Sequence, residues 1–251
     1  KSFKEFIRGD WFTFILYHQI NPSLFQAHLD FLSPRYRITN LDVLRDHYKK
    51  GTPLPKKALF ITFDDGWRSN YDLLQVIEER KIPITIFLTA DLIGSNKKPA
   101  PICNFNETNE TQYEIALPTI SHRTMLNIDE IKEMSKIVNF QSHGVSHYPL
   151  TCLKKSLVEK ELSQSKQIIE EITKQSVYAF AYPYNRATHR EAHIVKKCGY
   201  SLARIGGRTM NQSNASPFLL NCVGIGEDCS VKSLNRKLVR AELKTILNTR
   251  I

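Results

Sequence analysis

Short apolar segments alternate with helical patterns along this chain, and this alternation limits its fold more than any other feature. The segment at residues 58–63, for example, is almost entirely apolar, as buried strands are. The segment at residues 69–80 instead carries its apolar residues at helical spacing. Such alternation predicts a parallel sheet covered by helices, with reactive groups at the carboxyl ends of the strands. The predicted strands span residues 12–17, 58–63, 83–89, 137–140, 177–182, 200–203 and 218–223, and the predicted helices span residues 21–32, 41–48, 69–80, 129–136, 154–173, 188–197 and 231–248.

The number of strand and helix units indicates how the sheet is arranged. There are about seven or eight, near the size of the familiar (β/α) barrel, so we expect an α/β fold with a closed barrel. The chain has 251 residues, 41% of them hydrophobic, which is enough for one large core, and we expect a single domain. Residues 94–123 interrupt the alternation with many Pro, Asn and Thr residues. We expect a long inserted loop there, of the kind that often shapes a binding site.

Two adjacent carboxylates, Asp64 and Asp65, directly follow the strand at residues 58–63, and Gly66 comes next. Because neighbouring side chains diverge where a strand gives way to a turn, one carboxylate can bind a metal while the other faces a substrate. The alternative for this segment is a helix-capping acid in an Asp-Gly turn.

Two histidines four residues apart, His143 and His147, follow the predicted strand at residues 137–140. Gly144 and Pro149 argue against a regular helix, so we expect a compact loop in which both imidazoles can reach one ion. A pair of this kind is often structural. With an aspartate from a neighbouring strand end, however, it makes a site of two histidines and one carboxylate with open positions, which suits a catalytic zinc ion.

A rival pair, His189 and His193, has the same spacing and would lie on one face of a predicted helix. No strand end that carries a carboxylate is expected near it, and the neighbouring Arg190 and Lys196 disfavour a cation. We therefore prefer His143 and His147 as ligands.

Two weaker signals lie at other strand ends. Residues 180–185 leave a strand through a turn ordered by proline, which could direct a backbone N–H into a pocket or be a plain aromatic strand exit. His18 follows the strand at residues 12–17 and should lie on the same rim as the carboxylates. Whether it is catalytic or structural stays open at this point.

Three motifs, in this order along the chain, resemble those of one enzyme family. The segment at residues 62–66 reads TFDDG, the segment at 142–147 reads SHGVSH, and the segment at 180–184 reads FAYPY. Together they are similar to the motifs of polysaccharide deacetylases of carbohydrate esterase family four. The segment before the first motif, with LYH at residues 16–18, looks most like the branch that contains the poly-N-acetylglucosamine deacetylases.

The resemblance implies a distorted (β/α) barrel with about seven parallel strands and metal-dependent removal of N-acetyl groups from an amino-sugar polysaccharide or oligosaccharide. It also implies a divalent metal, most simply zinc. An O-acetyl glycan esterase with the same site and a non-catalytic glycan-binding relative stay open as alternatives. By position, the resemblance assigns Asp65, His143 and His147 to the metal, Asp64 to the general base, His18 to the general acid, and the backbone N–H of Tyr184 to the oxyanion.

Some positions depart from the family pattern. Gly144 stands where Ser or Thr is usual, so we expect that a hydrogen bond that braces the histidine loop is missing. Ala181 replaces an arginine that positions the base in the better-known branch, and Asn185 replaces a common glycine. The usual Asp and Trp motif and the C-terminal Leu-x-His motif are absent as well. The sequence thus identifies no partner for Asp64, and His18 gains weight as the acid.

The net charge of +10 indicates an anionic partner, such as an acidic or lipid-linked glycan, and leaves peripheral membrane contact open. Basic residues are scattered, and no nucleic-acid-binding module is recognisable, so nucleic acid is not expected. No run of about 18 apolar residues predicts a membrane span. The sequence gives no signal for the oligomeric state.

The five cysteines are odd in number and widely spaced, which is typical of reduced thiols and slightly favours the cytoplasm. The chain begins at Lys1 without methionine, so a removed signal peptide, with a cell-envelope or secreted location, stays open as the alternative.

Overall fold

The computed structural model describes residues 11–97, 99 and 124–248. Most of the loop predicted at 94–123 lies outside the described residues, as does Cys103. The strands are β1 (Trp11–Tyr17), β2 (Arg37–Ile38), β3 (Ala58–Asp65), β4 (Ile84–Leu88), β5 (Asn139–Ser142), β6 (Ala179–Ala181), β7 (Leu202–Arg204), β8 (Asn211–Gln212) and β9 (Cys222–Gly224). The α-helices are α2 (Pro22–Leu32), α3 (Leu41–Lys50), α4 (Leu74–Arg80), α5 (Ile128–Met134), α6 (Lys155–Thr173), α7 (His189–Lys197) and α8 (Val231–Asn248). Short 3₁₀ helices are η1 (Arg68–Leu73), η2 (Ala90–Leu92), η4 (Leu150–Cys152) and η5 (Pro183–Asn185).

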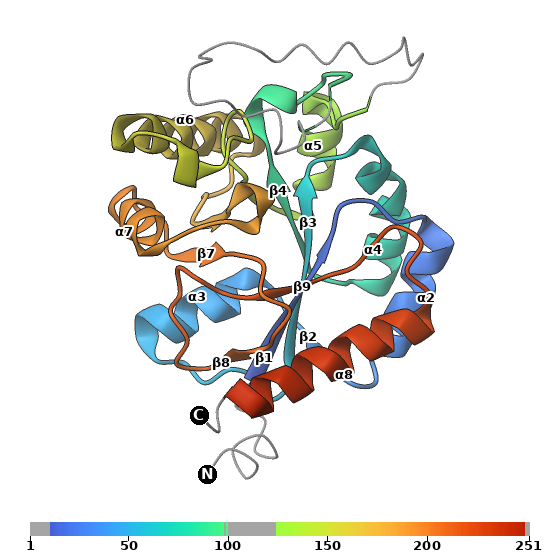
Figure 1. Cartoon of the computed structure of the whole chain (residues 1–251). Coiled ribbons are helices and arrows are strands. Elements are labelled where there is room, and N and C mark those ends of the chain that lie inside the picture. The colour runs from blue at the N-terminus through green and yellow to red at the C-terminus, as the bar shows by residue number, and fades with distance from the viewer. Residues whose placement is uncertain (1–10, 98, 100–123, 249–251) are drawn as a thin grey trace.

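These elements form a curled, mostly parallel sheet with helices around it, which is a distorted (β/α) barrel (Figure 1). The strand order is β7-β6-β5-β4-β3-β1-β8, with β2 paired to β3 and β9 paired to β1. The two sides of the curl meet through the segment at residues 220–224. It makes a parallel bridge from Leu220 to Arg204 at the end of β7 and then pairs as β9 with β1. The carboxyl ends of β7 and β3 therefore face a common interior.

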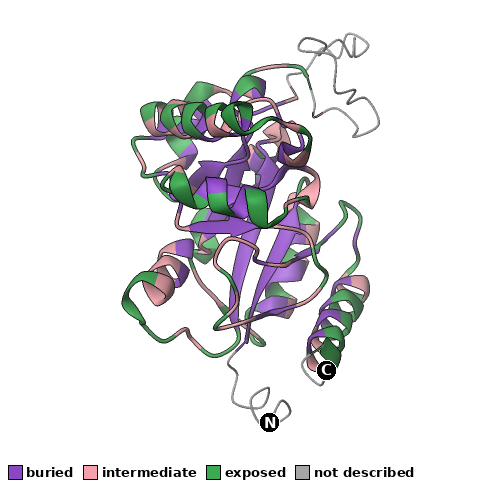
Figure 2. Cartoon of the chain, turned by 60° about the vertical axis from the view of Figure 1, so that its left-hand side comes forward, coloured by how far each residue is buried: buried purple, intermediate pink, exposed green. Residues whose placement is uncertain are grey.

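Side chains alternate between the two faces of the curled sheet, as the period of a strand requires. Phe12 and Phe14 of β1 belong to a hydrophobic cluster that also contains Phe60 and residues of β4, β6, β7 and β9. Because these strands lie on different sides of the curl, this cluster fills the barrel interior. Ile15 of β1 belongs to the larger cluster beneath the helices. Figure 2 shows the outcome, with buried strands in the centre and exposed outer helix faces.

The predicted elements are confirmed in type and order, but several boundaries shift. The predicted helix at 69–80 begins as the 3₁₀ helix η1 before it continues as α4. The predicted strand at 218–223 is reduced to the bridge at Leu220 and the three residues of β9. The two-residue strands β2 and β8 were not predicted, and β8 runs antiparallel to β1. Among the described residues, no helix is both long and apolar enough to cross a bilayer.

Candidate active site

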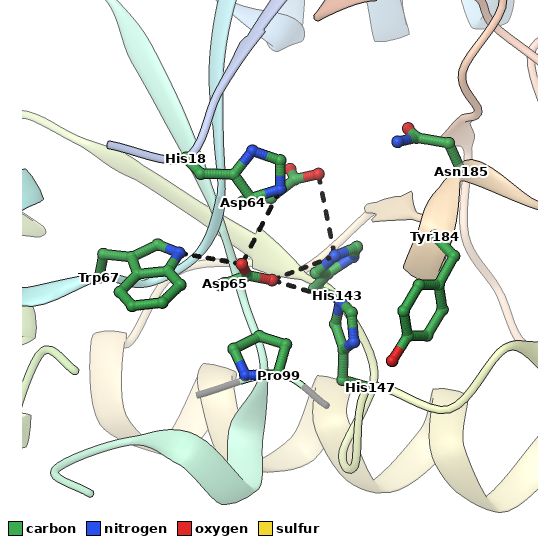
Figure 3. A pocket seen from close by; sticks show the side chains of 9 residues that line it. All are labelled: His18, Asp64, Asp65, Trp67, Pro99, His143, His147, Tyr184 and Asn185. Atoms are coloured by element: carbon green, nitrogen blue, oxygen red, sulfur yellow. Dashed lines mark hydrogen bonds and ion pairs between the residues drawn. The ribbon is translucent and has the colours of Figure 1, made fainter. Parts of the chain in front are cut away.

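A pocket of about 240 Å³ opens at the carboxyl ends of β1, β3, β5 and β6 (Figure 3). The polar residues of the pocket lie at or shortly after the ends of these strands, where hydrogen bonding to the neighbouring strands stops. The sequence-predicted site residues from four separate segments all lie here. The lining residues are His18, Asp64, Asp65, Trp67, Pro99, His143, His147, Tyr184 and Asn185.

Asp65 is the last residue of β3 and has a left-handed backbone, with φ of 73°. Gly66 follows with φ of 85°, and a Cβ atom there would lie 2.6 Å from Leu88 Cδ2, so the tight turn requires glycine. This turn brings Asp65 Oδ1 to 3.5 Å from Nε2 of His143 and 3.3 Å from Nε2 of His147. One ligand atom of each of these three buried residues lies within 4.8 Å of the others.

The donor set fits a divalent cation. Asp65 Oδ1 accepts no hydrogen bond from any described residue, although it is buried. Burial by itself would raise the pKa of Asp65, but the contact with His147 and the charges of His143 and His18 hold this pKa well below its usual range. The carboxylate is therefore ionised at neutral pH, as a metal ligand must be.

His143 is oriented by the backbone of β6. Its Nδ1 lies 2.7 Å from the carbonyl oxygen of Ala181, so Nδ1–H donates this hydrogen bond and the lone pair of Nε2 faces Asp65. Burial lowers the pKa of His143 to about 4, against the opposing effect of Asp64. The imidazole is thus neutral at physiological pH and ready to bind a metal.

The loop that carries the two histidines is braced by Glu161 of α6. Oε2 of Glu161 accepts hydrogen bonds from the backbone N–H groups of Val145 at 2.8 Å and Ser146 at 3.0 Å, and Oε1 accepts one from the Ser146 hydroxyl. Gly144 has φ of 87°, where a Ser or Thr side chain would be strained. Gly144 has no side chain to make the hydrogen bond that was expected to be missing, and the loop is braced from α6 instead.

Asp64, the preceding carboxylate, faces the barrel interior and is only 2% exposed. Its Oδ1 accepts a hydrogen bond from Nη2 of Arg204, and its Oδ2 lies 3.8 Å from Nε2 of His143. Arg204 is the last residue of β7 and is 1% exposed, so it forms a buried ion pair with Asp64. This is the partner of Asp64 that the motifs do not reveal. A cationic residue directly after the strand predicted at 200–203 was a usable signal, because strand ends of a parallel sheet share one edge.

Arg204 is itself held by three neighbours. Nη1 donates to Oδ1 of Asn185 at 3.3 Å and lies 3.3 Å from Sγ of Cys222, and the guanidinium carbon lies 5.1 Å from the ring centre of Phe87. Burial alone would lower the pKa of Arg204, but Asp64 raises it, so the arginine stays charged. Asn185, the departure from a common glycine, thus contributes an acceptor to the support of Asp64.

The side of the pocket that carries His18 is open to solvent. His18 directly follows β1 and its side chain is 46% exposed, with Nε2 at 3.9 Å from Asp65 Oδ2. That same oxygen accepts a hydrogen bond of 2.9 Å from the indole N–H of Trp67. Trp67 lies within the pocket but was not predicted, although it comes two residues after Asp65. Figure 3 shows His18 and Trp67 on one side of Asp65 and Tyr184 on the other.

Tyr184 lies on the opposite side, in the turn η5 after β6. Its backbone is left-handed, with φ of 55°, and its ring stacks edge-on against His147 at 4.7 Å between ring centres. The rival histidines His189 and His193 are both exposed on α7. In the part of the chain that the structure describes, they join no cluster of metal-ligating residues.

The fold is similar to that of a solved deacetylase structure. The structure of a deacetylase from Streptococcus pyogenes, PplD in complex with acetate, superposes with a TM-score of 0.72 at 19% identity, and covers 91% of this chain and 98% of that one. In sequence, the chain is 24% identical to YxkH of Bacillus subtilis over 149 residues, or 59% of this chain. It is 25% identical over 164 residues, or 61% of this chain, to poly-beta-1,6-N-acetyl-D-glucosamine N-deacetylase of Staphylococcus aureus. It spans 44% and 49% of the lengths of these two curated relatives.

The model of the polysaccharide deacetylase family matches residues 51–203, which is more than half of the chain. The chain therefore belongs to the polysaccharide deacetylase family. The matched region contains both carboxylates of the pocket and two of its three histidines, His143 and His147. It begins after His18 and ends one residue before Arg204.

Proposed function

We propose that this chain is a divalent-metal-dependent deacetylase that hydrolyses N-acetyl groups of an amino-sugar polysaccharide or oligosaccharide. The observation that carries this proposal is the arrangement of two functional units in one pocket. Asp65, His143 and His147 converge on one point, and the buried Asp64–Arg204 pair lies directly beside them. A metal site next to a second, oriented carboxylate suits metal-assisted acyl hydrolysis, in which a metal activates water and a carboxylate accepts its proton.

Asp65, His143 and His147 would hold the ion, and we propose zinc because two imidazoles and one carboxylate leave a position open for catalysis. When bound, such an ion supplies Lewis acidity, which polarises an acetyl carbonyl and lowers the pKa of water to about 7. Trp67 and Glu161 serve this unit indirectly. Trp67 donates a hydrogen bond to Oδ2 of Asp65, which faces away from the histidines. Glu161 holds the histidine loop by accepting hydrogen bonds from it.

Asp64 is the proposed general base, which takes a proton from the attacking water. Its Oδ1 is occupied by Arg204, so Oδ2, which faces His143, is the oxygen left for this proton. The ion pair with Arg204 holds the carboxylate of Asp64 in its orientation inside the barrel. A positioned base of this kind contributes about 10²–10⁴ to the rate.

His18 is the proposed general acid, because an amine leaves poorly as an anion and needs a proton. Its exposed position at the pocket rim allows it to exchange protons with water between turnovers. The backbone N–H of Tyr184 is the proposed oxyanion donor, since Tyr184 lines the pocket in the turn after β6.

The substrate proposed for a first test is β-1,6-linked poly-N-acetylglucosamine, because a staphylococcal relative is named as the N-deacetylase of this polymer. Acetate release should be measured from β-1,6-linked and β-1,4-linked N-acetylglucosamine oligomers and from an O-acetylated glycan. Each assay is run with zinc, with a chelator, and with zinc restored. We expect zinc-dependent acetate release from an N-acetylated oligomer.

The other outcomes separate the alternatives. Release only from the O-acetylated glycan would identify an esterase that uses the same site. Binding of oligomers without acetate release, at full zinc occupancy, would identify a non-catalytic glycan-binding protein. Activity that persists after complete removal of divalent metal would contradict the proposed role of the Asp65, His143 and His147 site.

A further inference from the structure

The terminal helix α8 has an apolar stripe on its outer face. Six large hydrophobic residues are exposed in the described part of the chain, and three of them belong to this helix. Val239 is 43% exposed, Leu243 is 54% exposed and Leu247 is 59% exposed. A spacing of four residues places them on one side of the helix. The opposite side, with Leu234, Leu238 and Ala241, is buried against the barrel, so the exposed stripe is not needed to pack α8 onto the protein (Figure 2).

The same outer face is strongly basic. Arg236, Arg240 and Lys244 are exposed and repeat with the spacing of the apolar stripe, so a row of cations runs beside it. The single acidic residue of the helix, Glu242, is half-buried on a different side and lies near Lys57. An apolar stripe flanked by cations on one helix face is typical of helices that lie in the interface of an anionic bilayer.

We propose that the outer face of α8 binds the surface of an anionic lipid bilayer. The three apolar side chains would enter the boundary between headgroups and acyl chains, while the arginines and the lysine contact lipid phosphates. The positive charge of this face favours an anionic bilayer over a second copy of the chain as its partner. In a symmetric dimer the same face is used twice, which would bring the two rows of cations together.

Contacts between α8 and the barrel show where the helix lies relative to the pocket. Near its C-terminal end, Thr245 accepts a hydrogen bond from the backbone N–H of Met210, which directly precedes β8. β8 pairs with Trp11 and Phe12, at the amino end of β1. The pocket lies at the carboxyl ends of the strands. The C-terminal part of α8 instead lies beside the amino end of β1, as the ribbon in Figure 1 shows. A bilayer bound to α8 would leave the pocket open toward a glycan that extends away from the membrane.

Co-sedimentation with vesicles tests this inference without reference to catalysis. The full chain is mixed with vesicles of phosphatidylcholine alone and with vesicles that contain about 30% phosphatidylglycerol, at low and at high salt. We expect binding to the anionic vesicles that weakens as salt rises. Arg236→Gln combined with Arg240→Gln and Lys244→Gln should lower the partition coefficient by about 100-fold, since each cation near the surface contributes about a factor of five. Leu243→Asn combined with Leu247→Asn should lower it by about tenfold or more.

Matched controls change the same residue types elsewhere. Leu157→Asn removes an exposed leucine of α6, and Lys196→Gln with Lys197→Gln removes two exposed cations of α7. Both should bind vesicles as the unchanged chain does, and thermal unfolding confirms that each variant is folded. Absence of vesicle binding by the unchanged chain, or equal binding by the α8 variants and their controls, would overturn the proposal. So would sedimentation that shows a dimer of the unchanged chain converted to a monomer by the leucine variants, because the stripe would then be a dimer contact.

Discussion

The proposed metal side and the proposed base side of the pocket are built from the chain in different ways. The metal side takes Asp65 from the end of β3 and His143 and His147 from one loop after β5, so two short segments supply all three ligand atoms. The base side takes Asp64 from β3, but its support comes from Arg204 at the end of β7, with Asn185 and Cys222 behind it. Two short segments are enough to position the ligands of one ion. The partner of a buried carboxylate, in contrast, can come from any strand whose end faces the barrel interior.

The largest expected effect is on the metal side. His143→Ala removes a ligand, so it should weaken zinc binding by more than the 10- to 100-fold that loss of an outer-shell partner typically costs, and abolish acetate release. Zinc affinity is measured by isothermal titration calorimetry. The matched control is His189→Ala, which removes an exposed histidine of α7 and should change neither quantity. Unchanged zinc affinity in His143→Ala would show that the ion binds elsewhere.

On the base side, Asp64→Asn should separate catalysis from metal binding. The amide cannot accept the proton, so kcat should fall by about 10²–10⁴. Zinc affinity should stay close to that of the unchanged chain, because Asp64 is not among the three convergent ligands. Steady-state kinetics and calorimetry on the same sample measure both quantities. Full activity would refute the role of Asp64, and loss of zinc would mean that the two sides are not separable.

Arg204→Met should test the support of the base. The variant leaves Asp64 buried without its ion-pair partner, which typically costs about 3–5 kcal/mol in the free energy of unfolding. We expect kcat to fall by at least about tenfold, with KM and zinc affinity little changed, because the base loses its fixed orientation. Combining Arg204→Met with Asp64→Asn should recover part of the stability, since no unpaired charge then remains. If the destabilisation of the double variant equals the sum of the destabilisations of the two single variants, the ion pair does not couple the two residues.

A smaller effect is expected from the brace of the histidine loop. Glu161→Gln keeps the shape of the side chain but weakens the hydrogen bonds to residues 145 and 146. Zinc affinity should fall by about tenfold, as for other outer-shell partners, and activity should return at saturating zinc. Glu171→Gln, on the exposed face of the same helix, is the control. A loss of kcat that zinc does not restore would indicate that Glu161 acts beyond the metal side.

The smallest effect is expected for Asn185→Gly. The variant removes one acceptor of Arg204, and the left-handed backbone at this position, with φ of 55°, suits glycine well. This hydrogen bond is long, at 3.3 Å, and acts on Asp64 only through Arg204, so kcat should fall by about fivefold or less, with the melting temperature nearly unchanged. A drop as large as that of Arg204→Met would give Asn185 a direct role in the reaction.

Much of the fold could be predicted because strand and helix periods are local properties of the sequence. The strand at 58–63 and the helix at 154–173 were found almost at their observed bounds, β3 at Ala58–Asp65 and α6 at Lys155–Thr173. The two-residue strands β2 and β8 were missed because they are too short to show a period. The single domain and the catalytic roles of the site residues stay predictions.

The sequence by itself determined the α/β alternation and the types and spacing of the metal-ligating residues. Both depend on residues that lie within a few positions of one another, so short motifs carry them. Only the tertiary structure decided that Arg204 pairs with Asp64 across 140 positions, that Glu161 braces the histidine loop, and that one face of α8 stays uncovered. These contacts depend on strand order and on the curl of the sheet, which bring distant residues together and leave no local pattern in the chain.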